Sequence, residues 1–218
     1  MYNLVMKDLR LGINSFFFVL PVLTGALMLV PGWIYFLVPL YFCWLTVPNM
    51  FGGFKAQNDL LFTAMMPVTK KDMVRARIVV IVLLELLHLA LAMIFGAITL
   101  RLYPQLTYNF FAPHMGFWGL CLAMFAIFNL ILIPMYYKTA YTYGKATAAS
   151  ITAAMLFAGI AQWLGIQNSS VADVFIGTGV DNTALQISIL AAGIVIFLGF
   201  TLMAYRIAVL RFQKVEAQ

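Results

Sequence analysis

Residues 11–54 read LGINSFFFVLPVLTGALMLVPGWIYFLVPLYFCWLTVPNMFGGF, without a single Asp, Glu, Lys or Arg. One helical crossing of a bilayer takes about 20 apolar residues, so this stretch is long enough for two crossings joined at Pro31-Gly32. Across the chain of 218 residues, 64% are hydrophobic and only 9% are charged. Such a chain has too few polar residues to cover a water-exposed surface. The sequence therefore predicts an integral membrane protein and excludes a soluble enzyme, a coiled coil and a disordered chain.

The positions of the charged residues predict further crossings. No Asp, Glu, Lys or Arg occurs at 102–137, 146–172 or 182–205, and each of these stretches holds one crossing. Another crossing is expected at about 76–100, with Glu85 deep inside it. The predicted fold is therefore an all-α polytopic membrane protein with six transmembrane helices. Their expected ranges are 16–30, 33–51, 76–100, 116–137, 146–166 and 183–205, with outer loops at 101–115 and 167–182.

The basic residues predict the orientation of the chain. Lys and Arg concentrate in the cytoplasmic loops of membrane proteins. With the N-terminus inside, 12 of the 13 basic residues face the cytoplasm and only Arg101 lies outside. We therefore expect both termini to be cytoplasmic and residues 1–218 to form a single transmembrane domain. The net charge of +6 then reflects topology and attraction to anionic lipid, and we expect no nucleic-acid partner.

The first fourteen residues carry a helical pattern of their own. Asn3, Lys7 and Arg10 share one face of such a helix, and apolar side chains occupy another. This pattern is typical of an amphipathic helix that lies in the membrane surface. It also fits a polar extension of the first span, and at this point both interpretations of residues 1–14 stay open.

Several residues inside the spans predict how the helices pack. Pro39 and Pro48 are expected to kink the second span, and Gly52-Gly53 to end it. Cys43 and Cys121 fall in different spans and indicate small core residues, not a disulfide. In the fifth span, small or short side chains recur every four residues, which is typical of a face that another helix approaches closely. These residues are Ala146, Ser150, Ala154, Ala158 and Gln162.

The chain lacks the motifs of an ATPase, a metalloenzyme or a membrane protease. A phosphate-binding loop needs Gly-x-x-x-x-Gly-Lys-Ser/Thr, but Gly144-Lys145 is followed by Ala146. Residues 85–88 spell Glu-x-x-His, yet a di-iron site needs a second copy, and Glu216 is the one other glutamate. We therefore expect no catalytic residue, no metal and no cofactor bound by this chain.

Glu85 and His88 lie about nine and twelve residues into the third span, on one helical face and near the bilayer midplane. Ionisable groups at that depth usually face the protein interior or a water-filled cavity. With Asn129 they are candidates to line a substrate pathway; the pair could also relay protons or anchor a polar contact between subunits. In the structural alternative, Glu85 is protonated, bonded to Asn129 or Gln162, and fixes the packing of helices.

The most informative segment connects the second and third spans at residues 54–75. Residues 59–77 read DLLFTAMMPVTKKDMVRAR, which indicates an amphipathic helix, a proline turn and a new helix. Thr69 is placed to cap the new helix, with Asp72 three residues later as in a capping box. A loop that only enforces topology is the alternative, but this segment is longer and more apolar than topology requires.

Met66-Pro67-Val68-Thr69-Lys70-Lys71, leading straight into the third span, resembles the Leu-Pro-Val-Ser/Thr-basic signature of small type-2 ABC exporter permeases. Met66 stands where Leu is commoner in that family. Six spans in about 220 residues and an amphipathic start are also similar to that family. Within it, the compact subgroup linked to export of antimicrobial and amphipathic peptides, including phenol-soluble modulins, is the most similar. The topology match covers the chain, whereas the motif covers about twenty residues.

The resemblance implies a mechanical role for residues 54–75. In such exporters this segment forms a coupling helix that docks on a separate ATPase subunit, which binds ATP and magnesium. Two ATPase copies and two permease chains, here expected to be a homodimer, make one transporter. The residues that the resemblance marks for coupling to the ATPase are Asp59, Met66, Pro67, Val68, Thr69, Lys70, Lys71, Asp72 and Arg75.

The leading hypothesis is a permease subunit of an ATP-driven exporter in a bacterial plasma membrane, moving an amphipathic or hydrophobic molecule such as a peptide. One alternative is a secondary transporter driven by an ion gradient through Glu85 and His88. That class predicts inverted repeats and more intramembrane charge, and the sequence shows neither. The other alternative is a membrane protein that binds a partner and transports nothing.

Overall fold

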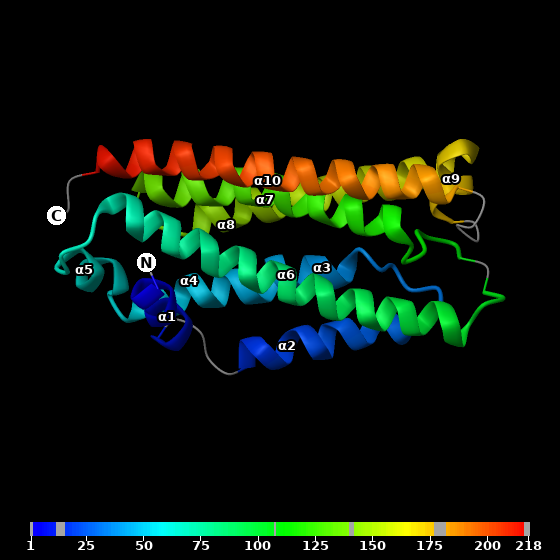
Figure 1. Cartoon of the computed structure of the whole chain (residues 1–218), viewed down its shortest axis with the longest axis horizontal. Coiled ribbons are helices and arrows are strands. Elements are labelled where there is room, and N and C mark those ends of the chain that lie inside the picture. The colour runs from blue at the N-terminus through cyan, green and yellow to red at the C-terminus, as the bar shows by residue number, and fades with distance from the viewer. Residues whose placement is uncertain (1, 12–15, 107, 140–141, 177–181, 216–218) are drawn as a thin grey trace.

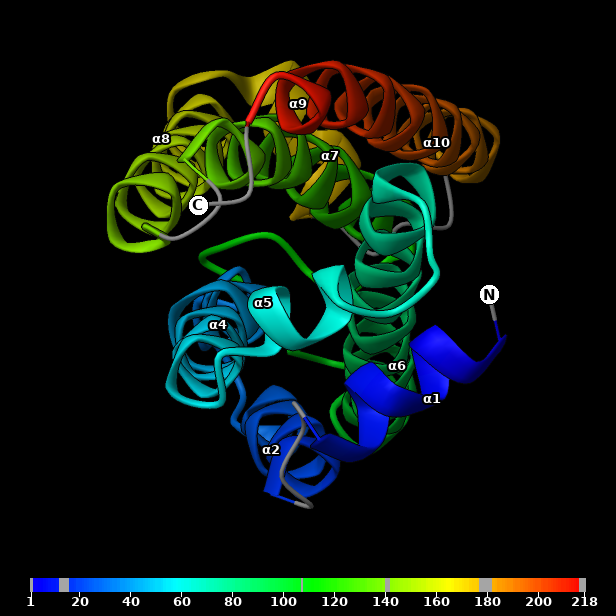
Figure 2. The same cartoon turned by 90° about the vertical axis from the view of Figure 1, so that its left-hand side faces the viewer.

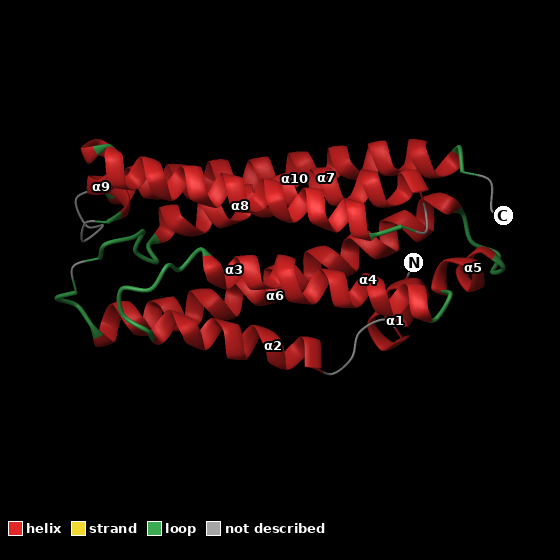
Figure 3. Ribbon diagram, turned by 180° about the vertical axis from the view of Figure 1, so that it is seen from behind, coloured by secondary structure: helices red, strands yellow, loops and turns green. Residues whose placement is uncertain are grey.

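A computed structural model of the chain describes residues 2–11, 16–106, 108–139, 142–176 and 182–215. Within these ranges every regular element is a helix (Figure 3). The chain starts with α1 (Tyr2–Leu11) and α2 (Phe16–Gly25), which ends in the 3₁₀ turn η1 (Ala26–Leu29). The other long helices are α6 (Lys70–Leu102), α7 (Met115–Thr139), α8 (Gly144–Gln167) and α10 (Thr183–Gln213), and α9 (Ser169–Phe175) is short.

The helices run roughly antiparallel, so that the molecule has two distinct ends (Figure 1). One end gathers α1, the start of α6 and the last turns of α10; we call it the basic end, because Lys and Arg are concentrated there. The opposite end holds the connection between α6 and α7 together with α9. The predicted segregation of charge is thus present in the fold.

Two groups of helices are visible when the molecule is viewed from the basic end (Figure 2). One group contains α7, α8 and α10. The other contains α2 and the two helices after it, α3 (Leu37–Tyr41) and α4 (Val47–Ala56). α6 lies between them and contacts both α2 and α10. α7 and α10 approach backbone to backbone, because a Cβ at Gly193 would overlap the main chain of Gly119. Such close crossings between small residues are typical of membrane helices.

The second predicted span changes its helical geometry between its two prolines, and the kink expected there stays a prediction. It consists of α3 (Leu37–Tyr41), a π-helical turn η2 (Phe42–Thr46) and α4 (Val47–Ala56). Pro39 and Pro48 flank the π-helical turn, where a missing N–H is tolerated more readily. The prediction that Gly52-Gly53 ends the helix is wrong. α4 continues to Ala56, because a membrane helix tolerates glycine and the first break in helical geometry comes at Asn58, with φ 48°.

Among the described residues, five helices are long and apolar enough to cross a membrane: Leu37–Ala56, Lys70–Leu102, Met115–Thr139, Gly144–Gln167 and Thr183–Gln213. The first expected span, Phe16–Leu29, is shorter than these. α2 ends at Gly25 and its continuation tightens into a 3₁₀ turn, while residues 12–15 lie outside the described ranges. An all-helical membrane fold is therefore confirmed, and the count of six spans stays a prediction, as does the placement of the termini.

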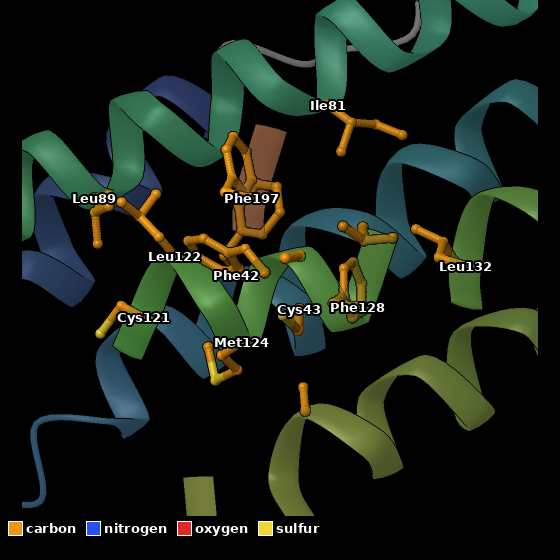
Figure 4. Close-up of a cluster of buried hydrophobic side chains, with 14 of the residues drawn as sticks. Phe42, Cys43, Ile81, Leu89, Cys121, Leu122, Met124, Phe128, Leu132 and Phe197 are labelled. Carbon is orange, nitrogen blue, oxygen red and sulfur yellow. The ribbon is translucent and has the colours of Figure 1, made fainter. Parts of the chain in front are cut away.

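The core lies between the two groups of helices and is aromatic and aliphatic (Figure 4). Phe42 of η2 packs edge-on against Phe125 of α7, with ring centroids 5.6 Å apart. Cys43 and Cys121 are buried free thiols, as predicted. The small-residue stripe of α8 lies on the buried face of that helix, because all five residues of the stripe are buried.

Candidate functional site

The predicted coupling segment begins with a short helix, α5 (Asp59–Ala64), at the basic end. Asn58 precedes it in the left-handed conformation, which turns the chain sharply out of α4. α5 then crosses from the end of α4 toward the start of α6 (Figure 2). The turn thus places the first residue of α5, Asp59, against two other helices.

Asp59 belongs to a closed cluster of four charged side chains that we call the ion ring: Lys7 and Asp8 of α1, Asp59 of α5 and Arg77 of α6. Lys7 Nζ lies 2.5 Å from Asp59 Oδ1 and 3.1 Å from Asp8 Oδ1. Arg77 Nε lies 2.9 Å from Asp8 Oδ2, and Arg77 Nη2 pairs with Asp59 Oδ2. The two positive and two negative side chains alternate around the ring, so α1, α5 and α6 are joined by a cluster without net charge.

The ion ring is shielded from solvent. The side chain of Lys7 is 12% exposed and those of Asp8, Asp59 and Arg77 are 3%, 6% and 8% exposed. Phe54 of α4 covers the guanidinium of Arg77, whose central carbon lies 3.3 Å from the ring centroid. Burial alone would raise the pKa of Asp59, but the Arg77 guanidinium and the Lys7 ammonium outweigh it and hold that pKa below its ordinary value. Asp59 therefore stays ionised in the folded protein.

Thr63 ties the next turn of α5 to the same cluster. Its hydroxyl accepts a hydrogen bond from Lys7 Nζ at 2.5 Å and donates one to the Asp59 carbonyl at 2.6 Å. A cavity of about 10 Å³ borders the ring. This is about the volume that one water molecule needs. Arg77 lines this cavity, and its Nη1 atom has no hydrogen-bond partner among the described residues.

α5 is an amphipathic helix that buries its polar side chains and exposes its apolar ones, the reverse of an ordinary surface helix. Its polar residues Asp59 and Thr63 are buried, whereas Phe62 is 56% exposed and Leu61 is 37% exposed. Met65, directly after the helix, is 80% exposed. Surface helices normally point their apolar side chains inward. An apolar surface displayed outward, next to exposed positive charges, is typical of a site that contacts another protein or the membrane surface.

The remaining predicted coupling residues form the turn into α6. Met66, Pro67 and Val68 make a tight turn, with the Val68 N–H donating to the Met66 carbonyl at 2.7 Å. Thr69 caps α6, as predicted: its Oγ1 accepts from the Asp72 N–H at 3.1 Å and donates to the Asp72 carboxylate at 2.6 Å. The turn is therefore fixed rigidly onto the start of α6.

The three basic residues of this turn differ in their surroundings. Lys70 Nζ donates to the Val215 carbonyl at 2.6 Å and lies 5.5 Å from the ring centroid of Phe212. Lys70 thus holds the end of α10, where a cation also stabilises the helix dipole. Lys71 and Arg75 are exposed. They, and not Lys70, are free to meet a partner protein or a lipid phosphate.

The predicted midplane residues are all fully buried. Asn129 Nδ2 of α7 donates to Glu85 Oε2 at 2.9 Å. His88 turns the other way, with Nε2 2.9 Å from the Val38 carbonyl and 3.3 Å from Thr24 Oγ1. The structure thus brings Glu85 and Asn129 together and separates His88 from them. Their assignment to a substrate pathway stays a prediction.

An apolar cavity of about 360 Å³ lies between the second span and α8, toward the end opposite the ion ring. Leu40 and Trp44 form one wall, and Met155 and Trp163 belong to the other. Gln162 also lines this cavity, and although it is only 9% exposed, neither of its amide atoms has a hydrogen-bond partner among the described residues. The cavity therefore combines an apolar surface with one hydrogen-bonding group, the Gln162 amide.

Three of the four ion-ring residues, Lys7, Asp8 and Arg77, are not among the coupling residues predicted from the sequence. One signal was present, because Asp8 is an acidic residue within an otherwise basic N-terminal segment. Arg77 was counted only as a topology signal. Neither residue's partner can be identified from spacing, since Asp8 and Arg77 lie on different helices.

The described part of the chain thus defines a polytopic helical membrane protein, in which the short helix α5 is fixed to α1 and α6 at the basic end. Residues 3–213 match the family described as ABC-2 family transporter protein, so the chain belongs to that family. It is the membrane component of an ABC transporter, a permease without an ATPase motif of its own, and such permeases normally work with an ATPase partner. No curated protein matches the chain. No solved structure matches it either.

Proposed function

We propose that this permease exports an amphipathic or hydrophobic molecule, and that α5 with the following turn receives the force of ATP hydrolysis from a separate ATPase. The carrying observation is the inverted amphipathicity of α5: Asp59 is fixed inside the ion ring while Phe62 and Met65 face outward. An element that transmits force needs one face anchored to the membrane helices and another free for the partner. α5 has both.

The ion ring supplies the rigid anchor. A push on α5 passes through Asp59 to Arg77 and so to α6, which runs the length of the bundle. It also passes through Lys7 to α1. At the far side of the turn, Lys70 connects the segment to the end of α10. The coupling segment is therefore attached to both groups of helices, which allows one movement of the ATPase to reposition them relative to each other.

The cavity between the second span and α8 supports the proposed class of cargo. Its walls suit an apolar body, and the Gln162 amide offers a hydrogen bond to a polar group on the same molecule. We propose two copies of the permease and two of the ATPase, with the basic end in the cytoplasm of a bacterial cell and transport directed outward. The charge distribution supports this orientation.

The test is co-purification with the ATPase in mild detergent from the native membrane. The double variant Phe62→Ser with Met65→Ser removes the exposed apolar surface without touching the ion ring. Burying each side chain in an interface contributes about 1–2 kcal/mol, so their loss should weaken binding roughly 30-fold or more. Tyr2→Ser is the matched control, because Tyr2 is 74% exposed at the same end.

We expect an ATP-binding subunit at equal stoichiometry with the native chain and with Tyr2→Ser, and its loss from the double variant. Equal recovery with all three chains would exclude α5 as the docking element. A native chain that purifies alone, from cells that express the ATPase, would argue against the exporter itself. Asp59→Ala is unsuitable for this purpose, since it leaves two buried cations short of a partner.

A further inference from the structure

A side-chain hydrogen bond joins α6 to α7 deep in the bundle, where Asn129 Nδ2 donates to Glu85 Oε2 at 2.9 Å. Both residues are completely buried. The other two oxygens of the pair, Glu85 Oε1 and Asn129 Oδ1, have no hydrogen-bond partner among the described residues. Two buried polar atoms on neighbouring, bonded side chains thus lack partners, and each is costly in an apolar interior.

Glu85 carries no compensating positive charge within the described ranges. Among the described residues no Lys or Arg pairs with it, and Arg77 of the same helix is held in the ion ring. His88, one turn further along α6, donates toward the Val38 carbonyl and Thr24, on the side of α2 and α3. The Cys43 thiol of η2 is a further titratable side chain near Glu85. An anionic carboxylate would therefore stand alone in the membrane interior, which is unfavourable.

A proton on Glu85 removes the uncompensated negative charge and supplies a hydrogen-bond donor for the two oxygens that lack partners. An ionised carboxylate is an acceptor only, so it cannot bond to the acceptor Asn129 Oδ1. A neutral carboxylic acid has one donor and one acceptor, which are complementary to the acceptor and donor of an amide. With the proton on Glu85 Oε1, that group donates to Asn129 Oδ1 while Asn129 Nδ2 continues to donate to Oε2. The two partnerless oxygens then become partners of each other.

We propose that Glu85 is a neutral carboxylic acid joined to Asn129 by two hydrogen bonds, and that this acid–amide pair fixes α6 to α7. Glu85 is then a positioning residue. It lies eight residues beyond Arg77, about 12 Å along α6 from the ion ring. α7 is in turn packed tightly against α10 at Gly119 and Gly193. The pair is therefore one point at which movement of α6 reaches the helices of the other group.

Infrared spectroscopy of the purified permease in lipid nanodiscs tests the protonation directly and needs no cargo. We expect the C=O stretch of a protonated carboxylic acid at pH 7 and at pH 8, where exposed carboxyl groups with a pKa near 4 are ionised. Glu85→Gln should remove this band, and Asn129→Leu should shift it. Asp173→Asn, at an exposed carboxylate of α9, should leave it unchanged. Absence of the band at pH 7, or its persistence in Glu85→Gln, would overturn the proposal.

Thermal unfolding tests the role of the pair in fixing the helices. Glu85→Gln preserves two amide–amide hydrogen bonds and should shift the midpoint by no more than about 2 °C. Glu85→Leu leaves the Asn129 amide without a partner and should lower it by about 5 °C, and adding Asn129→Leu should recover most of that loss. Equal midpoints for Glu85→Gln and Glu85→Leu would contradict the pairing.

Transport separates this inference from coupling to an ion gradient. ATP-dependent export by Glu85→Gln should equal that of the native chain, because Gln copies the neutral acid. Loss of export in a correctly assembled Glu85→Gln permease would show that a titrating carboxyl is required and would overturn the proposal. The ATP dependence of the native chain reports on the proposed function separately, so the two can fail independently.

Discussion

Replacing Asp8 by Asn opens the ion ring at its most buried carboxylate. Asp8 is 3% exposed and contacts both cations, with Lys7 Nζ at 3.1 Å and Arg77 Nε at 2.9 Å. Asn has nearly the same shape but carries no charge. The variant therefore leaves two cations with Asp59 as their one anionic partner, in a site shielded by Phe54.

The expected cost follows from that burial. Removing one partner of a buried ion pair destabilises a protein by about 3–5 kcal/mol, because the opposite charge stays desolvated. The retained polar contacts of Asn place Asp8→Asn at the low end, about 3 kcal/mol. For a chain of this length, 1 kcal/mol changes the midpoint of thermal unfolding by roughly 2–4 °C, so a decrease of about 6–12 °C is expected.

The assay is thermal unfolding of the detergent-solubilised permease, together with limited trypsin digestion. Loosening of α1 should speed cleavage after Lys7, whose side chain is 12% exposed in the intact ring. Asp173→Asn is the control, because Asp173 is an exposed carboxylate at the opposite end. If Asp8→Asn unfolds and is digested like Asp173→Asn, the ring does not hold α1 to the coupling segment.

Three further predictions use controls that the chain itself supplies. Gly193→Ala should lower the unfolding midpoint by several degrees, because a Cβ there overlaps the α7 backbone. Gly199→Ala is the control, since a Cβ at Gly199 meets open space and should leave the midpoint unchanged. Equal effects of the two variants would contradict the close crossing. Lys70→Met should release the end of α10 and speed digestion of the C-terminal residues. Lys71→Met is the control and should leave the digestion rate unchanged. The same digestion rate in both variants would show that Lys70 does not anchor the end of α10. The pKa of Asp59 is lower in the folded chain than in the unfolded one, so its contribution is fully present above about pH 4 and is lost as the pH falls through the folded value. The unfolding midpoint should therefore be steady from pH 7 to pH 5 and fall at lower pH, and Asp59→Asn should flatten this pH dependence; an unchanged profile would refute it.

Features encoded by local chemistry could be read from the sequence. The apolar stretches predict the long helices, and the Thr69 cap follows from a threonine with an acid three residues later. The four-residue period of small side chains predicts the buried face of α8. Each of these signals depends on residues within a few turns of one another, where helical geometry determines which side chains meet.

Features that depend on contacts between distant segments could not be read in this way. The ion ring joins residues of α1, α5 and α6, and Lys7 or Arg77 has the same charge whether it faces lipid phosphate or a buried carboxylate. A single sequence does not distinguish these environments. The end of α4 was misplaced for a related reason: glycine weakens a helix in water, whereas in the membrane the backbone hydrogen bonds have no competing partner.

Photo-crosslinking from the exposed surface of α5 tests the central claim most directly. A photoreactive group attached at Met65→Cys, in native membranes, should crosslink to an ATP-binding subunit, and the yield should change when ATP is added. The same group at Tyr2→Cys, which is similarly exposed at the same end, should label lipid or solvent but not that subunit. Crosslinking of the ATPase from Tyr2→Cys and not from Met65→Cys would contradict the account, because the force of ATP hydrolysis would then enter the permease elsewhere.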